Sequence, residues 1–287
     1  MSLLRRLTPR LARTTRSYVD VAAYRRDGYT IPDWSLPPER LRSAQGALDS
    51  LLANNQQVMP EQLVNAHLVE GGGAVRGQSE FLALASMPEI ADMAAACLGT
   101  ENVILWACQV WAKPAGTGKS VPWHQDGQYW PIEPLRAMTA WIALDRSDEE
   151  SGALRIVPGT HASGETIPHV QRVEAGAAIS YVADPSLLDV PLLSTAATLT
   201  LEPGQVSLHD SMVLHASGPN ASTRRRAGVA ATFMPGECHF YRDRPTEGAL
   251  KGGLDLDYSS RPLFVVRGRN AHPDNELVHD LTSSRRT

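Results

Sequence analysis

The sequence Val121-Pro122-Trp123-His124-Gln125-Asp126-Gly127 places a histidine two residues before an aspartate. If these residues form a strand, positions i and i+2 point to the same face, so the His124 imidazole and the Asp126 carboxylate can reach one point in space. Such a pair supplies two of the three ligands of a 2-His-1-carboxylate site, which suits non-haem Fe(II) and leaves coordination positions open. An isolated triplet of this kind is more often a loop with a surface histidine and a capping aspartate, so the rest of the chain must decide.

The chain on both sides of this stretch is rich in short strands. From about residue 102 to 235, apolar runs of strand length alternate with turns that contain Gly and Pro, which is typical of a sandwich or jelly roll. In the predicted strand 137–144, the even-numbered positions are all apolar and are expected to enter the core, whereas Thr139 and Trp141 on the other face are expected to form a cavity wall. Further strands are predicted at 103–106, 110–111, 153–157, 197–201, 205–209, 212–215 and 226–234.

The N-terminal part, residues 18–100, is predicted to be mainly helical. A first helix begins near Tyr18 and ends at Gly28, and a short strand follows at residues 29–31. Pro37-Pro38-Glu39 opens a second helix, because proline is favoured in a first turn, and the apolar residues after it repeat at helical spacing. Another helix begins at Met87-Pro88-Glu89 and ends at Gly99.

Three further segments flank or interrupt this core. Residues 1–17 are basic and contain no acidic residue, which fits either a leader such as a mitochondrial transit peptide or a frayed N-terminal segment. Residues 160–196 lack clear periodicity, and a long segment of this kind in a compact domain is usually a lid. Residues 236–287 form a polar C-terminal extension with one strong strand candidate at 262–266. We therefore predict a single domain over residues 18–287.

Composition and charge argue against several classes of protein. The net charge is -4 and the isoelectric point is about 6.1, so no broadly basic surface for nucleic acid is expected. No apolar run reaches the length of a membrane span. The three cysteines are scattered without zinc or disulfide spacing, which fits a reducing compartment. We expect a cytoplasmic protein, or a mitochondrial one if residues 1–17 are a transit peptide; the oligomeric state stays open.

Two downstream stretches change the interpretation of the triplet. SGALRIVPGTH at residues 151–161 and LHDSMVLHASGPNASTRRR at residues 208–226, together with WHQD at residues 123–126, resemble the phytanoyl-CoA dioxygenase family of Fe(II)/2-oxoglutarate-dependent oxygenases. The resemblance covers about residues 20–245. It implies a mainly β fold with flanking helices, namely a double-stranded β-helix or cupin-like jelly roll. It also implies Fe(2+), the cosubstrate 2-oxoglutarate and O2, with ascorbate able to support activity.

The same resemblance assigns the metal ligands. His124, Asp126 and His215 match the three ligand positions of the family. His209 lies six residues before His215 and is not expected to be a ligand, because the family pattern places the ligand at residue 215.

The resemblance also assigns a cosubstrate pocket. Arg226 matches the arginine that binds the distal carboxylate of 2-oxoglutarate, and Ser217 matches a hydroxyl that supports the same carboxylate. Trp141 and Lys113 fall near positions that line this pocket. Because alternate residues of a strand face opposite sides, Arg225 is expected to point away from Arg226. The residues that follow Arg226 on its own face are small, which leaves space for the cosubstrate.

The implied activity is hydroxylation of a small or medium-sized metabolite, with release of succinate and CO2. Desaturation or cyclisation by the same cofactor chemistry stays open, as does a non-catalytic jelly-roll binding protein. Halogenation is not expected, because halogenating relatives carry Gly or Ala in place of the carboxylate ligand, and Asp126 is present. Residues expected to approach the substrate, and to suggest a polar or anionic group beside an aromatic wall, are Gln128, Tyr129, Trp130, Trp111 and Arg155.

Overall fold

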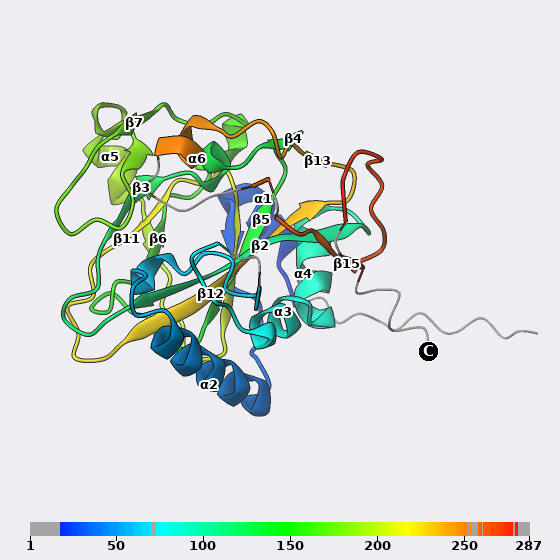
Figure 1. The fold of residues 1–287 in the computed structure, drawn as a ribbon. Helices are drawn as coiled ribbons and strands as arrows, with labels where there is room; N and C mark the ends of the chain where they lie inside the picture. The colour runs from blue at the N-terminus through cyan, green and yellow to red at the C-terminus, as the bar shows by residue number, and fades with distance from the viewer. Residues whose placement is uncertain are drawn as a thin grey trace, which may run out of the picture.

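The computed structural model describes residues 18–70, 73–251, 253, 258–259, 261–277 and 279–280, so the predicted leader at residues 1–17 lies outside the described part. These residues form a β core with helices packed outside it (Figure 1). The helices are α1 (Val21–Asp27), α2 (Pro38–Asn54), α3 (Ser79–Ala85), α4 (Pro88–Leu98), α5 (Val190–Ser194) and α6 (Glu247–Lys251), with short 3-10 turns η1 (Pro60–Gln62), η2 (Asp126–Tyr129), η3 (Thr160–Ser163) and η4 (Pro185–Leu187). The strands are β1 (Tyr29–Thr30), β2 (Val103–Lys113), β3 (Val121–His124), β4 (Ile132–Glu133), β5 (Met138–Ala143), β6 (Leu154–Ile156), β7 (His169–Gln171), β8 (Tyr181–Ala183), β9 (Ala197–Thr198), β10 (Val206–Asp210), β11 (His215–Ser217), β12 (Arg226–Pro235), β13 (His239–Phe240), β14 (Phe264–Arg267) and β15 (His279–Asp280).

Two sheets make up the β core. The larger has seven strands in the order β1-β10-β5-β12-β2-β14-β15, and the smaller has four in the order β3-β11-β6-β9. All neighbouring strands in both sheets are antiparallel except β14 and β15. Strand order therefore jumps repeatedly between distant parts of the chain, as in a jelly roll. The predicted double-stranded β-helix is confirmed.

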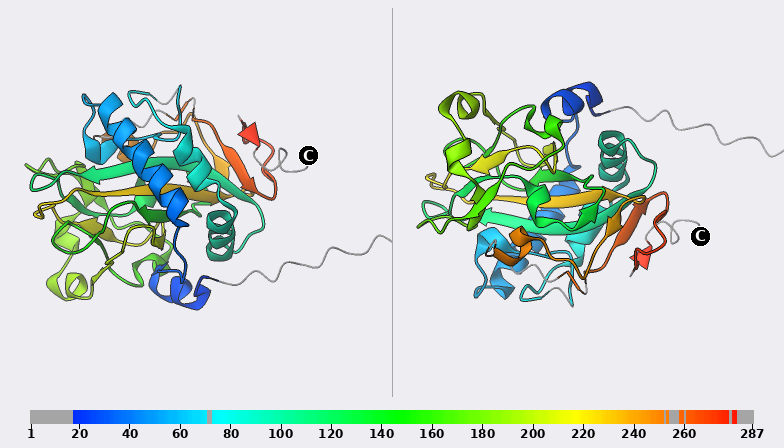
Figure 2. Two further views of the ribbon diagram at one scale, coloured as in Figure 1. Left: turned by 90° about the horizontal axis from the view of Figure 1, so that it is seen from below. Right: turned by 90° about the horizontal axis from the view of Figure 1, so that it is seen from above.

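Helices cover the outer face of the larger sheet. Figure 2 shows α2 crossing the strands on this face, with α3 and α4 beside it. Leu48 and Leu51 of α2 and Ile90 of α4 are buried in one apolar cluster with Ile142 of β5 and Val229 of β12. Complete burial of an aliphatic side chain contributes about 1.5–3 kcal/mol, so this layer fixes the helices on the sheet. The opposite face of the larger sheet lines a cavity, which is described below.

The helix ends follow the local sequence. α1 ends at Gly28 (φ 80°) and α4 ends at Gly99 (φ 64°), both in the left-handed region that glycine adopts without strain. α2 begins with Pro38 in its first turn and buries Ala44, Leu48 and Leu51. These predicted helices are confirmed. Among the described residues no single helix is long and apolar enough to cross a membrane; α3 and α4 meet that requirement only as a pair bent by 51°.

The structure differs from the sequence predictions in two places. Residues 160–196 are not irregular throughout, because β7 pairs with β8 and α5 follows; these elements are too short to produce periodicity. The strand predicted at 212–215 is wrong, since β11 runs from His215 to Ser217. The Asp210 carboxylate accepts a hydrogen bond from the Met212 backbone N–H at 2.8 Å, which forms a turn ahead of the strand.

Candidate metal and cosubstrate site

A cavity lies between the two sheets, on the face of the larger sheet that the helices do not cover. Gln109, Trp111 and Lys113 line it from β2, and Thr139 and Trp141 line it from β5. The smaller sheet contributes residues of β3, β6 and β11. The predicted cavity-wall face of β5 is therefore confirmed, while Met138, Ala140 and Ile142 of the same strand enter the core.

His124, Asp126 and His215 come together at this cavity. β3 pairs with β11 so that His124 and His215 are direct partners, and Asp126 begins the 3-10 turn η2 immediately after β3. The Oδ1 atom of Asp126 lies 3.5 Å from His124 Nε2 and 3.7 Å from His215 Nε2. The candidate ligand atoms of the three residues lie within 4.8 Å of one another. Asp126 thus reaches the pair from a turn rather than from the strand that the sequence predicted.

The two imidazoles are held in one orientation by the backbone. Nδ1 of His124 lies 2.9 Å from the Pro122 carbonyl oxygen, and Nδ1 of His215 lies 3.0 Å from the Val213 carbonyl oxygen. A carbonyl oxygen can only accept, so Nδ1 carries the proton in both rings, and the Nε2 lone pairs face the cluster. Each carbonyl belongs to the residue two positions before its histidine, so the local chain path sets the orientation.

The ionisation of the cluster suits a divalent cation. Burial, followed by the neighbouring His124, lowers the pKa of His215 to about 3, so this ring is neutral at physiological pH. Burial would raise the pKa of Asp126, but the surrounding imidazoles, His215 first among them, outweigh it and hold that pKa well below its usual range. Neutral imidazole and carboxylate are the protonation states that bind metal. The residues therefore fit a 2-His-1-carboxylate metal centre.

A pair of buried cations lies at another part of the same cavity. Lys113 and Arg226 are direct partners in the β2–β12 ladder and are 0% and 3% exposed. Lys113 Nζ donates to the Ser217 hydroxyl at 2.8 Å and to the Gly218 carbonyl, and Arg226 donates to the Gly152 carbonyl. Nε of Arg226 has no hydrogen-bond partner in the described structure. No carboxylate of the described residues forms an ion pair with either cation.

The electrostatics of this pair favour an anionic ligand. Burial, followed by the charge of Arg226, lowers the pKa of Lys113 to about 6, and burial lowers that of Arg226 to about 10. Burial of a guanidinium and an amine without a carboxylate in contact disfavours their charged forms, and a bound anion would offset this cost and favour protonation of Lys113. A planar guanidinium can also form two parallel hydrogen bonds with a carboxylate. Trp141 packs under Arg226, with its ring centroid 5.2 Å from the guanidinium carbon.

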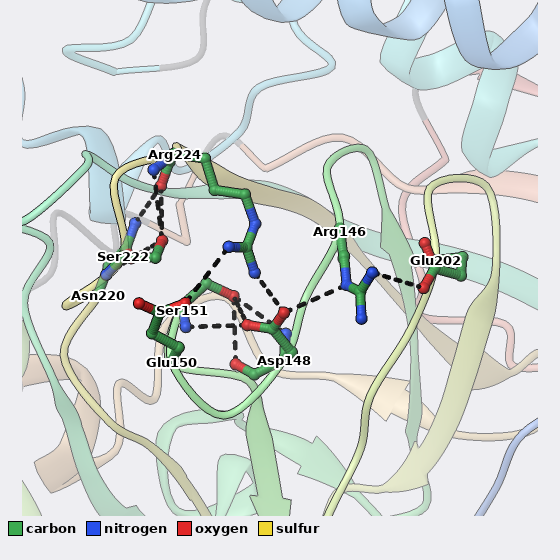
Figure 3. A network of polar contacts seen from close by, with 8 residues as sticks. All are labelled: Arg146, Asp148, Glu150, Ser151, Glu202, Asn220, Ser222 and Arg224. Atoms are coloured by element: carbon green, nitrogen blue, oxygen red, sulfur yellow. Dashed lines mark hydrogen bonds and ion pairs between the residues drawn. The ribbon is translucent and has the colours of Figure 1, made fainter.

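A polar network holds the loops beside Arg226 (Figure 3). In this network the Asp148 carboxylate binds the guanidinium of Arg224 and accepts from Arg146 Nε at 3.2 Å. Arg224 also lies 3.6 Å from Glu150. The loop that follows β5 is thereby fastened to the start of β12, which fixes the Gly152 carbonyl where Arg226 donates to it.

The three consecutive arginines point in different directions. Arg225 forms hydrogen bonds of 2.8 Å with Asp145 and with Asp49 of α2, away from the cavity. Arg226 lines the cavity, so the predicted alternation of faces is confirmed. Glycine is required at position 228 on the same face, because a Cβ there would lie 2.2 Å from the Trp141 ring.

The expected substrate residues separate into two groups. Trp111, Tyr129 and Trp130 line the cavity, but Gln128 and Arg155 do not. Arg155 alternates along β6 with Leu154, which lines the cavity, so Arg155 points outward and stacks on Trp123 at 5.5 Å. Gln128 lies in the 3-10 turn η2, where three residues complete one turn, so it does not share the side of Asp126 and Tyr129. The expectation that these two residues approach the pocket is corrected.

Sequence analysis missed several cavity residues. Gln109 precedes Trp111 by two positions in β2 and therefore shares its face, a signal that the sequence contained. Ile179 reaches the cavity from the segment 160–196, and no local pattern indicated it. His209 of β10 also lines the cavity and lies 3.7 Å from the Asp126 carboxylate.

A jelly roll that encloses a His-Asp-His cluster beside a buried cationic pocket is the arrangement of the non-haem iron, 2-oxoglutarate-dependent oxygenases. The family model for phytanoyl-CoA dioxygenase (PhyH) matches residues 24–228 of the chain. The protein therefore belongs to the phytanoyl-CoA dioxygenase family, as the sequence motifs predicted.

Individual relatives support the same assignment. The chain is 28% identical over 205 residues to the peroxisomal phytanoyl-CoA dioxygenase of Bos taurus, covering 66% of this chain and 59% of that protein. It is 37% identical over 139 residues to a probable alpha-ketoglutarate-dependent hypophosphite dioxygenase of Stutzerimonas stutzeri, covering 48% and 47% of the two chains. The chain thus spans about half to three fifths of these curated relatives. Among solved structures, the epimerase SnoN in complex with Fe3+, alpha ketoglutarate and nogalamycin RO has the same fold, with a TM-score of 0.63, 22% identity, and coverage of 86% and 97%.

Proposed function

We propose that this protein is an Fe(II)- and 2-oxoglutarate-dependent dioxygenase that hydroxylates a small or medium-sized metabolite and releases succinate and CO2. The observation that carries the proposal is the buried cation pair, Lys113 and Arg226, in the same cavity as the His-Asp-His cluster. A metal centre alone is compatible with many reactions. A dicarboxylate cosubstrate needs both a metal and a separate cationic pocket, and this cavity has residues for both.

The proposed roles follow from the positions of the side chains. His124, Asp126 and His215 would hold Fe(II), and Arg226, Lys113 and Ser217 would hold the distal carboxylate of 2-oxoglutarate. When bound, the iron and the cosubstrate supply the oxidising chemistry by which O2 is activated and 2-oxoglutarate is decarboxylated. The protein's own contribution is binding, orientation and exclusion of water.

The segment 160–196 is proposed to act as the lid of this cavity. The first part of the segment is held close to the metal cluster by the buried Gln125 side chain. This side chain accepts a hydrogen bond from the Ile167 backbone N–H at 2.6 Å and donates one to the Met212 carbonyl at 2.5 Å. Farther along the segment, Ile179 contributes to the cavity wall. The tip of the connection between β7 and β8, residues 172–175, is exposed, with Val173 at 82% exposure, and is the part proposed to move.

Residues 18–287 are proposed to form one domain. One apolar cluster joins Val19 beside α1, Leu48 of α2, Val110 of β2 and Phe264 of β14. The helical part, the jelly roll and the described portion of the C-terminal extension therefore share a core, which supports a single folding unit.

The cavity favours a substrate with an apolar body and an uncharged polar group. Trp111, Tyr129, Trp130 and Ile179 provide an aromatic and aliphatic wall, and Gln109 provides an amide that can both donate and accept. The sequence-based expectation of an anionic substrate group depended partly on Arg155, which lies outside the cavity. The two cations that do line it are assigned to the cosubstrate.

The test is succinate formation from 2-oxoglutarate with Fe(II), ascorbate and O2, screened against a library of small metabolites. The expected result is succinate release that a subset of metabolites stimulates, together with a product heavier by one oxygen atom. Product lighter by two hydrogen atoms would indicate desaturation or cyclisation instead. His124→Ala, Asp126→Ala and His215→Ala should each abolish both iron binding and succinate release. Absence of succinate with fully iron-loaded, folded protein would favour a non-catalytic binding protein.

A further inference from the structure

A row of three polar side chains crosses the larger sheet beneath the metal cluster. His209 of β10 is the direct partner of Thr139 in β5, and Thr139 is the direct partner of Thr232 in β12. All three line the cavity and are buried, with exposed fractions of 3%, 2% and 3%. The hydroxyl oxygens of Thr139 and Thr232 lie 3.2 Å apart. Antiparallel pairing on three adjacent strands thus places three polar groups side by side in an otherwise largely apolar sheet.

Two residues of this row, Thr139 and His209, lie close to the same carboxylate oxygen of Asp126. Thr139 Oγ1 donates to Asp126 Oδ2 at 3.4 Å, and His209 Nε2 lies 3.7 Å from that oxygen. The other oxygen, Oδ1, is the one that faces His124 and His215. The carboxylate therefore has one oxygen turned toward the proposed metal and one turned toward the sheet.

His209 differs from the two histidines of the cluster. Their Nδ1 atoms are fixed by backbone carbonyls, whereas Nδ1 of His209 is buried and has no hydrogen-bond partner in the described structure. His209 is also not a member of the His-Asp-His group whose ligand atoms converge. Because a bare Nε2 lone pair would repel the carboxylate, the ring should present Nε2–H to Asp126. At 3.7 Å this contact is longer than a hydrogen bond, and a shift of about half an ångström would bring it into range.

We propose that His209, together with Thr139, is a positioning residue that holds Asp126 Oδ2 on the sheet side, so that only Oδ1 can bind the metal. This inference rests on the proposed function of the site. A carboxylate that bound through both oxygens would occupy a coordination position needed for the cosubstrate or O2. Groups that orient a metal ligand in this way commonly change metal affinity when they are removed. The sequence did not predict His209 to be a metal ligand; its contact with Asp126 gives it a different role.

The test measures metal binding rather than turnover. Co(II) serves as the probe, because its visible absorption reports coordination number and geometry. His209→Leu should raise the dissociation constant for Co(II) about tenfold and change the positions and intensities of its visible bands, as expected when a second carboxylate oxygen takes a coordination position at the metal. His209→Gln, which keeps an N–H donor at similar reach, should restore the wild-type spectrum and an affinity within about threefold. Thr139→Val should shift the spectrum in the same direction as His209→Leu.

His67→Leu is the matched control. His67 is as buried as His209, with 2% exposure, but packs edge-on against Phe264 and does not line the cavity. This variant should bind Co(II) like the wild type. An equal change in His67→Leu would trace the effect to general loss of stability and would overturn the proposal.

Other outcomes also decide against it. An unchanged spectrum and affinity in His209→Leu would remove the positioning role. Complete loss of Co(II) in both His209→Leu and His209→Gln, as in His215→Ala, would make His209 a ligand. Should His209→Leu fail to fold, an unchanged spectrum in Thr139→Val would overturn the proposal equally. If the wild-type protein bound no Co(II), the proposed function itself would be refuted. If the wild-type protein bound Co(II) and released succinate, but the variants showed the wild-type affinity and spectrum, only the role of His209 would be refuted.

Discussion

Replacement of Arg226 by lysine tests the cosubstrate pocket most directly. The Arg226 guanidinium is 3% exposed, donates to the Gly152 carbonyl, and retains a buried Nε–H without a partner. The Trp141 ring beneath it fixes the plane of the guanidinium. A lysine at this position keeps the positive charge but presents a single point of donation, so it cannot reproduce two parallel hydrogen bonds to one carboxylate.

The expected loss follows from one charge-assisted hydrogen bond. Such a bond contributes about 1.5–3 kcal/mol, which corresponds to a change in dissociation constant of roughly 10-fold to 100-fold. Lys113 remains in place and its Nζ can still donate a hydrogen bond to the carboxylate, so the lower part of this range is expected. We predict that Arg226→Lys weakens 2-oxoglutarate binding at least tenfold, equivalent to roughly 1.4 kcal/mol.

The assay is calorimetric titration of 2-oxoglutarate into protein loaded with Co(II), repeated as a 2-oxoglutarate titration of succinate release with Fe(II). Arg225→Lys is the matched control, because Arg225 forms its ion pairs with Asp145 and Asp49 outside the cavity. Arg224→Lys should also change the affinity little, since Arg224 binds Asp148 rather than lining the cavity. A larger effect at residue 224 than at residue 226 would show that the wrong arginine has been assigned.

Three more predictions concern the cavity and its cover. Gly228→Ala should lower the free energy of unfolding by about 1–3 kcal/mol and weaken 2-oxoglutarate binding, because its Cβ would displace the Trp141 ring; thermal melts and the same titration check this, and an unaltered affinity would contradict it. The pKa of Lys113 is about 10.5 in the unfolded chain and about 6 in the folded one, so its contribution makes the free energy of unfolding rise with pH between these two values. Lys113→Met should remove this pH dependence, raise the melting temperature at neutral pH and weaken 2-oxoglutarate binding. A melting temperature lowered at every pH would contradict this prediction. Amide hydrogen exchange in the exposed turn of the segment 160–196 should slow when substrate joins the metal and 2-oxoglutarate, whereas strong protection already present without ligands would argue against a lid.

Much of the local structure could be read from the sequence. The apolar stripe of α2, the glycines that end α1 and α4, and the two faces of β5 depend on periodicity within a few residues, and all are observed. The opposite orientations of Arg225 and Arg226 follow from the same alternation. His124 and Asp126 are close in sequence, so their convergence was also a local inference. The position of His215 in the cluster had to come from resemblance to a family, because no local rule joins it to the other two.

Only the tertiary structure decided which distant residues share the cavity. Lys113 faces Arg226, and His209 faces Thr139, because the strand register pairs them, and the sequence of a single strand does not state its partner or register. The same limit explains the misplaced Gln128 and Arg155, whose side-chain directions depend on a 3-10 turn and on which face of β6 meets the larger sheet. Periodicity fixes how residues alternate along an element, whereas long-range strand pairing and packing fix what each face meets, and the candidate site is built almost entirely from the second kind of information.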